Sequence, residues 1–219
     1  MMKIVKGQYQ DDEGGLYDRV TSIVGVLAKP GLIAWAAKLA AETGDPTSHT
    51  KESQSAKERG TAAHLWIKQQ YVAPDNNPPD DILPYHTAWN RWRENWPHHP
   101  IVMEKTVRHS EHMYAGTMDM LADHEGKQFI VDFKTTAKIK GRAWPDYRLQ
   151  VEAYRMALEH ENDAPGSVAG VGIVTFDAHG EYRMDMWENS DAGVVQEAFR
   201  AALCLYRWNR AYSRKGYHE

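Results

Sequence analysis

The chain has 219 residues and a formal net charge of -4, a length typical of one sizeable domain, so we expect a single domain over 1–219. Its composition, 42% hydrophobic and 26% charged, is enough for a hydrophobic core and excludes an intrinsically disordered chain. The single cysteine, Cys204, excludes a disulfide framework and a cysteine metal cluster, and the net charge argues weakly against a protein that coats nucleic acid nonspecifically.

The N-terminal part, about residues 1–98, is predicted to be helical. The clearest signal is an alanine-rich amphipathic pattern that stops at Gly44. Helices are expected near Thr21, over 32–43, over 51–71 and around the tryptophans Trp89, Trp92 and Trp96.

After residue 98 the pattern changes to short runs rich in β-branched and apolar residues, which predict strands. The predicted strands cover 101–109, 113–123, 127–135, 168–176 and 181–187. Helices are predicted over 147–160 and 192–210. This order indicates an α/β fold in which a central mixed sheet, over about 100–190, is flanked by helices, with a C-terminal helix over about 191–213.

Two acidic residues fall on neighbouring predicted strands. Asp132 and Lys134 are two positions apart and therefore point to one face of their strand. If Glu125 and Gly126 form a two-residue turn, continuing the register sets Asp119 opposite Asp132. An unpaired carboxylate in an apolar strand is costly, and a bound cation would remove that cost.

Each candidate also has a simpler interpretation. Lys134 can form a structural ion pair with Asp132 or Asp119 on the sheet face. A lone helical histidine such as His64 is more often structural than a ligand, although a turn of small residues after Gly60 would let its helix approach the sheet.

Other polar residues leave alternatives open. Glu104 lies on the first long predicted strand. It can be an acid that supports the metal ligands without binding the metal, an acid that binds the metal through a water molecule, or a solvated strand residue. The pairs His98 with His99 and His109 with His112 have no carboxylate or cysteine partner at a recognisable spacing, so surface or loop positions are expected for them. Cys204 lies in an apolar helical run, where a buried structural thiol is expected.

An ordered series of short motifs runs through residues 58–156. Its segments read Glu-Arg-Gly-Thr-Ala-Ala-His, Tyr-Ala-Gly-Thr-Met-Asp-Met, Ile-Val-Asp-Phe-Lys-Thr-Thr and Leu-Gln-Val-Glu-Ala-Tyr. The series resembles the RecB-like branch of the PD-(D/E)XK nucleases. This resemblance implies a restriction-endonuclease-like core and a nuclease active site.

The resemblance also implies roles for particular residues. His64, Asp119 and Asp132 would be metal ligands, and Lys134 the catalytic lysine, with Asp119, Asp132 and Glu104 also counted among the catalytic residues. Gln150 and Tyr154 are four positions apart and therefore lie on one face of a helix. By the resemblance they would contact DNA or shape the site, and we expect them among the nucleic-acid-binding residues.

The expected cofactor is Mg²⁺ or Mn²⁺, as one or two ions, because carboxylates suit both and an imidazole suits manganese as well. Some RecB-like members hold an iron–sulfur cluster through four cysteines, and with Cys204 alone this chain forms none. In its compact form without a cluster the chain looks similar to phage exonucleases and to the mitochondrial genome maintenance exonuclease.

DNA contact is expected from the segment after the catalytic strand. It combines basic and aromatic side chains, which can neutralise phosphates and stack on bases: Lys138, Lys140, Arg142, Trp144, Tyr147 and Arg148. The alternatives are an ordinary exposed basic loop and, for Trp144, an anchor that holds the start of the next helix.

Together these features predict a metal-dependent DNA nuclease, an exonuclease that acts on free DNA ends with single-stranded character. A structure-specific endonuclease and an inactive nucleic-acid-binding module are the alternatives. No apolar stretch approaches the roughly 20 residues that span a membrane, and the N-terminal segment lacks the apolar centre of a signal peptide. A cytoplasmic protein without a membrane partner is therefore expected.

Overall fold

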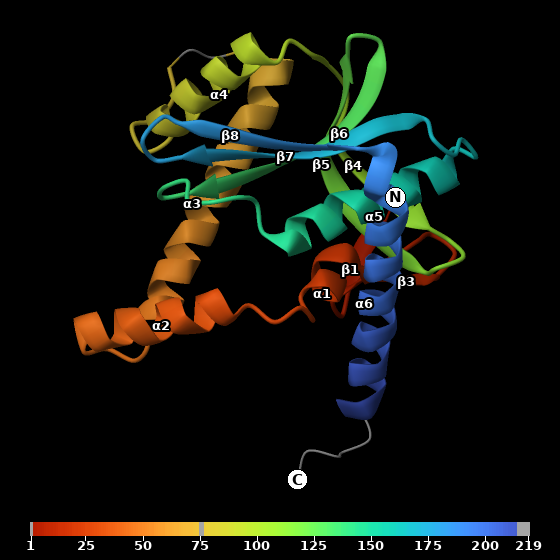
Figure 1. The fold of residues 1–219 in the computed structure, drawn as a ribbon, viewed down its shortest axis with the longest axis horizontal. Coiled ribbons are helices and arrows are strands. Elements are labelled where there is room, and N and C mark those ends of the chain that lie inside the picture. Colours follow the sequence, from red (N-terminus) through yellow and green to blue (C-terminus); the bar gives the residue numbers. More distant parts are fainter. Residues whose placement is uncertain (1, 75–76, 214–219) are drawn as a thin grey trace.

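The computed structural model describes residues 2–74 and 77–213, which form a mixed sheet with helices on both faces (Figure 1). The fold class predicted from the sequence is confirmed. The sheet follows the order β1-β2-β3-β5-β6-β7-β8, and β4 pairs with β5 outside this path. The β6–β7 and β3–β5 pairs are parallel, and the remaining pairs are antiparallel.

The prediction of a wholly helical N-terminal part was wrong. Three short strands precede the first helix: β1 (Lys3–Val5), β2 (Gln8–Gln10) and β3 (Leu16–Arg19). Lys6 and Gly7 both have positive φ and close the two-residue turn between β1 and β2. β3 then pairs with β5, far away in the sequence, so its partner leaves no local signal.

The helices that follow match the prediction closely. They are α1 (Val20–Val24), α2 (Pro30–Thr43), α3 (Ser48–Val72) and α4 (Leu83–Asn95). α2 ends at Gly44, whose left-handed conformation with φ 67° suits a glycine. α2 and the first half of α3 extend away from the sheet (Figure 1).

The second half of the chain also follows the predicted order. Its strands are β4 (His99–His109), β5 (Tyr114–His124), β6 (Lys127–Thr136), β7 (Val168–Asp177) and β8 (Tyr182–Glu188). Its helices are α5 (Pro145–Glu161), a short 3-10 turn (Asn189–Asp191) and α6 (Ala192–Ser213). The two-residue turn at Glu125 and Gly126 has positive φ at both positions and pairs His124 with Lys127.

Hydrophobic cores lie on both faces of the sheet. One core joins α1, α5 and α6 to sheet residues such as Met118 and Ile130. The other joins α3 and α4 to the opposite face, through residues such as Met120 and Phe133. Met118 and Met120 are two positions apart in β5 and still belong to different cores, so the regular alternation of the strand is interrupted at Asp119.

Cys204 differs from its prediction because it is exposed. α6 buries Phe199, Ala202 and Leu203. Cys204 follows Leu203, and because successive residues of an α-helix are about 100° apart around its axis, the Cys204 side chain points away from the buried face. Within the described part of the chain, no helix is both long and apolar enough to cross a bilayer.

Candidate active site

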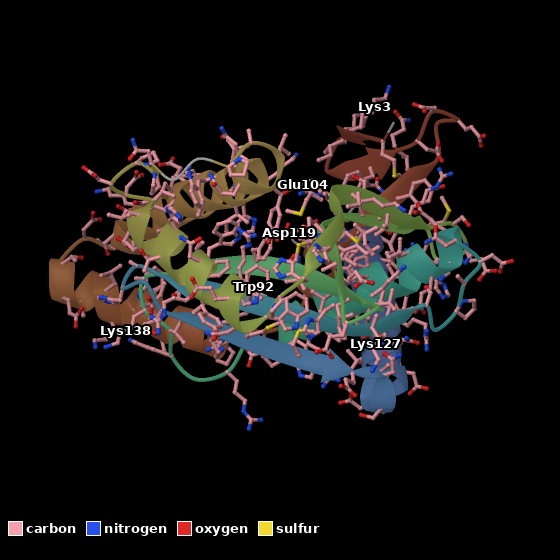
Figure 2. All side chains as sticks on the ribbon, turned by 90° about the horizontal axis from the view of Figure 1, so that it is seen from above. Lys3, Trp92, Glu104, Asp119, Lys127 and Lys138 are labelled. Atoms are coloured by element: carbon pink, nitrogen blue, oxygen red, sulfur yellow. The ribbon has the colours of Figure 1, made fainter. Side chains whose placement is uncertain are left out.

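The predicted carboxylates lie where β5 and β6 separate. The pairing of these strands ends at Met120 and Val131, and Asp119 and Asp132 are the next residues. Beyond that point the backbone N–H of Phe133 donates to Oδ2 of Asp119, at 2.7 Å. A side chain therefore satisfies a strand N–H group, and Asp119 is fixed between the two strands. Figure 2 shows Asp119 near the middle of the molecule.

Asp132 is held from two directions. It is 2% exposed, and its Oδ2 lies 2.5 Å from the Nζ of Lys134. Its Oδ1 accepts a hydrogen bond of 2.9 Å from Nε2 of Gln150 on α5. Although Lys134 is close, Oδ2 accepts no hydrogen bond of regular geometry within the described residues. The ion pair that the sequence left open for Lys134 is thus present, and Asp132 keeps a poorly satisfied buried oxygen.

Gln150 and Tyr154 lie inside the site rather than on an exposed surface. Gln150 is 7% exposed and Tyr154 2%. The Nε2 group of Gln150 donates to the Tyr154 hydroxyl, at 2.9 Å, as well as to Asp132. Of the two roles implied by the sequence, their position suits shaping the site and leaves no surface for direct DNA contact.

His64 approaches the same acids from α3. Its Nδ1 lies 3.5 Å from Oδ2 of Asp119, and its side chain is 28% exposed. Burial lowers the pKa of His64, and the nearby charge of Asp132 opposes this shift. A neutral imidazole therefore faces the carboxylates. The expected turn of small residues is part of a continuous helix, and Gly60 lies against Thr135, where a Cβ would come within 3.0 Å of Oγ1.

Charge is concentrated at this point of the sheet. Burial raises the pKa of Asp119 well above its usual value, and the negative charge of Asp132 adds to the shift. Burial alone would lower the pKa of Lys134, but the charges of Asp132 and Asp119 outweigh it and raise the pKa. One buried acid, paired with the ammonium of Lys134, thus lies beside a second, largely buried acid, an arrangement that a bound cation would stabilise.

Glu104 borders the same space. It sits in β4 with φ 52°, a strained conformation for a residue with a side chain. Burial raises the pKa of Glu104, Lys68 opposes the shift, and Asp132 adds to it. A cavity of about 580 Å³ opens here and is lined by His64, Glu104, Asp119 and Lys134, among others.

A second cavity, of about 660 Å³, lies on the other side of Lys134 and shares Lys134 and Thr135 with the first. Residues after β6 line it, including Lys138, Lys140, Arg142 and Trp144. Its opposite wall is α2, which contributes Trp35. Trp35 was not singled out from the sequence, because only the structure shows that α2 buries no residue and faces this cavity.

Arg148 is not part of this second cavity. Its guanidinium pairs with Asp191 and lies 5.2 Å from the ring of Trp187. Both partners are residues of this chain, so Arg148 is occupied within the fold. The structure brings together Lys138, Lys140, Arg142 and Trp144 in the second cavity, and Arg148 lies beside Arg142 and Trp144 in a neighbouring pocket.

The model of the PD-(D/E)XK nuclease superfamily matches residues 84–215, more than half of the chain. This chain belongs to the PD-(D/E)XK nuclease superfamily. The match includes Glu104, Asp119, Asp132 and Lys134, whereas His64 lies before it.

A curated relative of this superfamily member is mitochondrial genome maintenance exonuclease 1 of Xenopus tropicalis, which is 31% identical over 112 residues. That alignment covers 49% of this chain and 28% of the relative, so the chain spans less than a third of that protein.

Solved structures of similar shape include an alkaline exonuclease (LHK-Exo) of Laribacter hongkongensis, with TM-score 0.46 and 11% identity over 91% of this chain and 92% of that one. The same enzyme in complex with dAMP gives TM-score 0.44 and 13% identity, over 90% and 91%. The structure of SSO0001 gives TM-score 0.42 and 12% identity, over 85% and 75%.

The nuclease motif is not the tightest group of metal-ligating side chains. Among the described residues, one set of three has all its ligand atoms within 4.8 Å of one another, and it consists of His109, Glu111 and His160. His64, Asp119 and Asp132 do not meet that distance in this arrangement, in which Lys134 lies against Asp132.

Proposed function

We propose that the chain is a metal-dependent deoxyribonuclease that removes nucleotides from DNA ends. The observation that carries this proposal is that Asp132, which is buried and paired with the ammonium of Lys134, lies beside the largely buried Asp119 where β5 and β6 separate. Burying charged carboxylates lowers the stability of a protein, and sites with such shifted pKa values are typical of catalytic residues. Membership of a nuclease superfamily gives the reaction class, hydrolysis of a phosphodiester.

The donor set fits a divalent cation. Asp132 has a buried oxygen without a regular hydrogen bond, and Asp119 carries a pKa raised by burial and by the charge of Asp132. We assign Asp119, Asp132 and neutral His64 as the ligands of Mg²⁺ or Mn²⁺, because oxygen donors suit both ions and the imidazole suits manganese. When bound, the ion supplies an activated water and neutralises charge on the phosphate.

The protein's own groups have distinct tasks in this proposal. Lys134 carries a positive charge beside the acids and stabilises negative charge that develops on the phosphate. Gln150 holds the Asp132 carboxylate in one orientation, and Tyr154 in turn accepts from Gln150. Glu104 borders the cavity, where its carboxylate can orient a water molecule.

We assign the second cavity to the DNA strand. Lys138, Lys140 and Arg142 supply positive charge for phosphates, and Trp144, which is 49% exposed, supplies a ring for an unpaired base. The cavity reaches Lys134 directly, so a strand bound there would end at the acids. This supports a free end with single-stranded character as the substrate.

The relative's name, an exonuclease, favours the action on ends. The test is digestion of labelled linear DNA and of covalently closed circular DNA with Mg²⁺, Mn²⁺ or EDTA. We expect loss of the linear label with either ion, no product from circles, and no product with EDTA. Nicked or linearised circles would instead indicate an endonuclease, and binding without any product would indicate an inactive module.

A further inference from the structure

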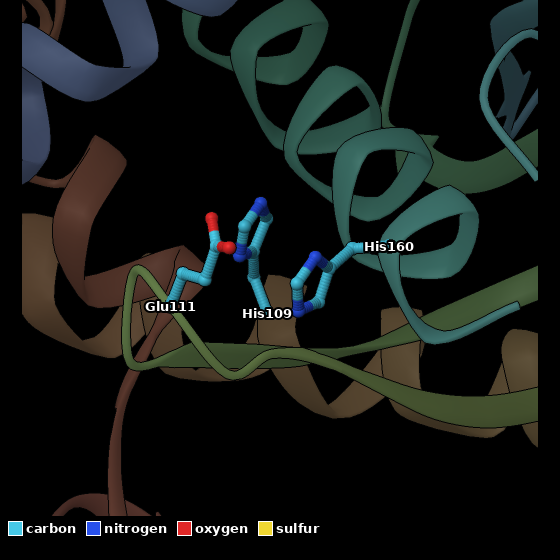
Figure 3. Close-up of side chains that lie close together, drawn as sticks. All are labelled: His109, Glu111 and His160. Carbon is cyan, nitrogen blue, oxygen red and sulfur yellow. The ribbon is translucent and has the colours of Figure 1, made fainter. Parts of the chain in front are cut away.

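A cluster of two histidines and a glutamate lies at the far end of α5 from Gln150. His109 is the last residue of β4, Glu111 lies in the turn to β5, and His160 is in the last turn of α5. One ligand atom of each lies within 4.8 Å of the other two. Figure 3 shows the Glu111 carboxylate beside the His109 ring, with the His160 ring on the other side of His109.

The two imidazoles are held in place by the fold. Their rings are parallel within 10°, with centroids 4.0 Å apart. His109 is 7% exposed, so its ring cannot rotate freely. The Ser110 hydroxyl lies 2.7 Å from Nε2 of His160, which leaves Nδ1 of that ring for another partner. A hydrogen bond on one ring nitrogen that orients the other is the usual arrangement at a histidine metal ligand.

Glu111 completes the set with an anionic oxygen. Within the described residues its carboxylate makes no ion pair or hydrogen bond, and the side chain is exposed. It can therefore rotate toward the histidines. Ligand atoms bound to zinc at about 2.0–2.1 Å in a tetrahedron lie about 3.3 Å apart. Because the lone pair of an imidazole nitrogen lies in the ring plane and the two rings are nearly parallel, the less buried ring of His160 must rotate to direct its nitrogen at the same ion as His109.

We propose that His109, Glu111 and His160 form a second metal site, which takes Zn²⁺ or a similar transition metal and not Mg²⁺. Two imidazoles and one carboxylate are ligands that zinc prefers, whereas magnesium prefers oxygen donors alone. The ion joins the β4–β5 turn to the C-terminal end of α5. Because α5 also carries Gln150, the site clamps the helix that orients Asp132.

This proposal does not depend on the proposed nuclease activity, because its direct readout is metal affinity and thermal stability. Metal-stripped protein in excess Mg²⁺ is titrated with ZnCl₂, and both the bound zinc and Tm are measured. An ion that binds the folded state alone raises Tm with its concentration. We expect Zn²⁺ to raise Tm, and the same addition of further Mg²⁺ to leave it unchanged.

The decisive comparison uses His160→Asn and Glu111→Gln, since these positions are not buried and the replacements keep a polar side chain. We expect each to weaken zinc binding on the order of tenfold or more and to reduce the rise in Tm. His179→Asn and Glu125→Gln, exposed positions elsewhere, serve as matched controls and should behave as wild type. Unchanged zinc affinity and Tm response in both cluster variants, with circular dichroism showing a normal fold, would overturn the proposal.

Discussion

Gln150 on α5 donates a hydrogen bond of 2.9 Å to Asp132 on β6, so a helix fixes the orientation of a carboxylate on the sheet. The same amide group donates to Tyr154, and Lys134 lies 3.4 Å from its Oε1. Gln150 therefore contacts three of the predicted site residues at once. It positions the acid without any exposed surface of its own for substrate.

Gln150→Ala should weaken metal binding and cleavage by about 10- to 100-fold, because an unsupported ligand carboxylate loses its fixed orientation. Tyr154→Phe removes the hydroxyl alone and should have a smaller effect. Activity measured against the concentration of Mg²⁺ and of Mn²⁺ separates a shift in metal affinity from a lower maximal rate. Wild-type metal dependence in well-folded Gln150→Ala would contradict this role.

Gly116 lets β5 pass close to the ring of Tyr154. A Cβ at Gly116 would lie 2.4 Å from Cε1 of Tyr154, a ring that is 2% exposed and cannot move away. Gly116→Ala should therefore lower the free energy of unfolding by about 1–3 kcal/mol in urea denaturation. Gly193→Ala in α6 is the control: no atom lies within 4 Å of its Cβ, so it should be neutral or stabilising by up to about 1 kcal/mol.

Trp144 tests the assignment of the second cavity. If its exposed ring stacks on a base, Trp144→Ala should lower affinity for single-stranded DNA about 5- to 100-fold and leave duplex affinity nearly unchanged. Trp208→Ala, at another exposed tryptophan on α6, should change neither affinity. A lower Tm with both affinities intact would show instead that Trp144 anchors the start of α5.

His98 should make the protein less stable in mild acid. Burial lowers the pKa of His98 to about 4, and its ring nitrogens lie 2.7 Å from the Trp96 carbonyl and the Tyr71 hydroxyl. In the unfolded chain His98 has a pKa of about 6.5, so it binds a proton below that pH, whereas in the folded chain it stays neutral down to about pH 4. The free energy of unfolding therefore falls as the pH drops from about 6.5 to about 4.

The loss attributable to His98 between pH 7 and pH 5 is up to about 2 kcal/mol. His98→Gln should be less stable at pH 7 and should show a smaller further loss at pH 5, measured by urea denaturation at both values. The other histidines with a lowered pKa, His64 and His109, contribute equally in both proteins. An identical pH dependence in wild type and variant would contradict the assignment.

Local sequence signals were sufficient for the strands β4 to β6 and for the register at the turn between β5 and β6. A two-residue turn fixes which residues pair, and this led from His124 and Lys127 to the acids at the point where β5 and β6 separate. The N-terminal strands were missed because each is three or four residues long, and β3 is stabilised by parallel pairing with β5.

The residues that the structure brings together around Asp132 could be named from the sequence, but their arrangement could not. Spacing places Gln150 and Tyr154 on one helix face, yet only the packing of α5 shows that this face is turned toward Asp132. Likewise, the pair His109 and His112 gave no ligand set in sequence, because its partner His160 comes from a helix that the fold brings back to the β4–β5 turn.

The central claim, that the acids where β5 and β6 separate perform the chemistry, is tested most directly with Asp132→Asn. Cleavage of end-labelled single-stranded DNA with Mg²⁺, DNA affinity and circular dichroism are measured on one preparation, with Asp123→Asn at the other end of the hairpin as control. We predict a loss of cleavage on the order of a hundredfold or more for Asp132→Asn, with fold and affinity largely kept and the control active. Near-normal cleavage by a well-folded Asp132→Asn protein would contradict the account.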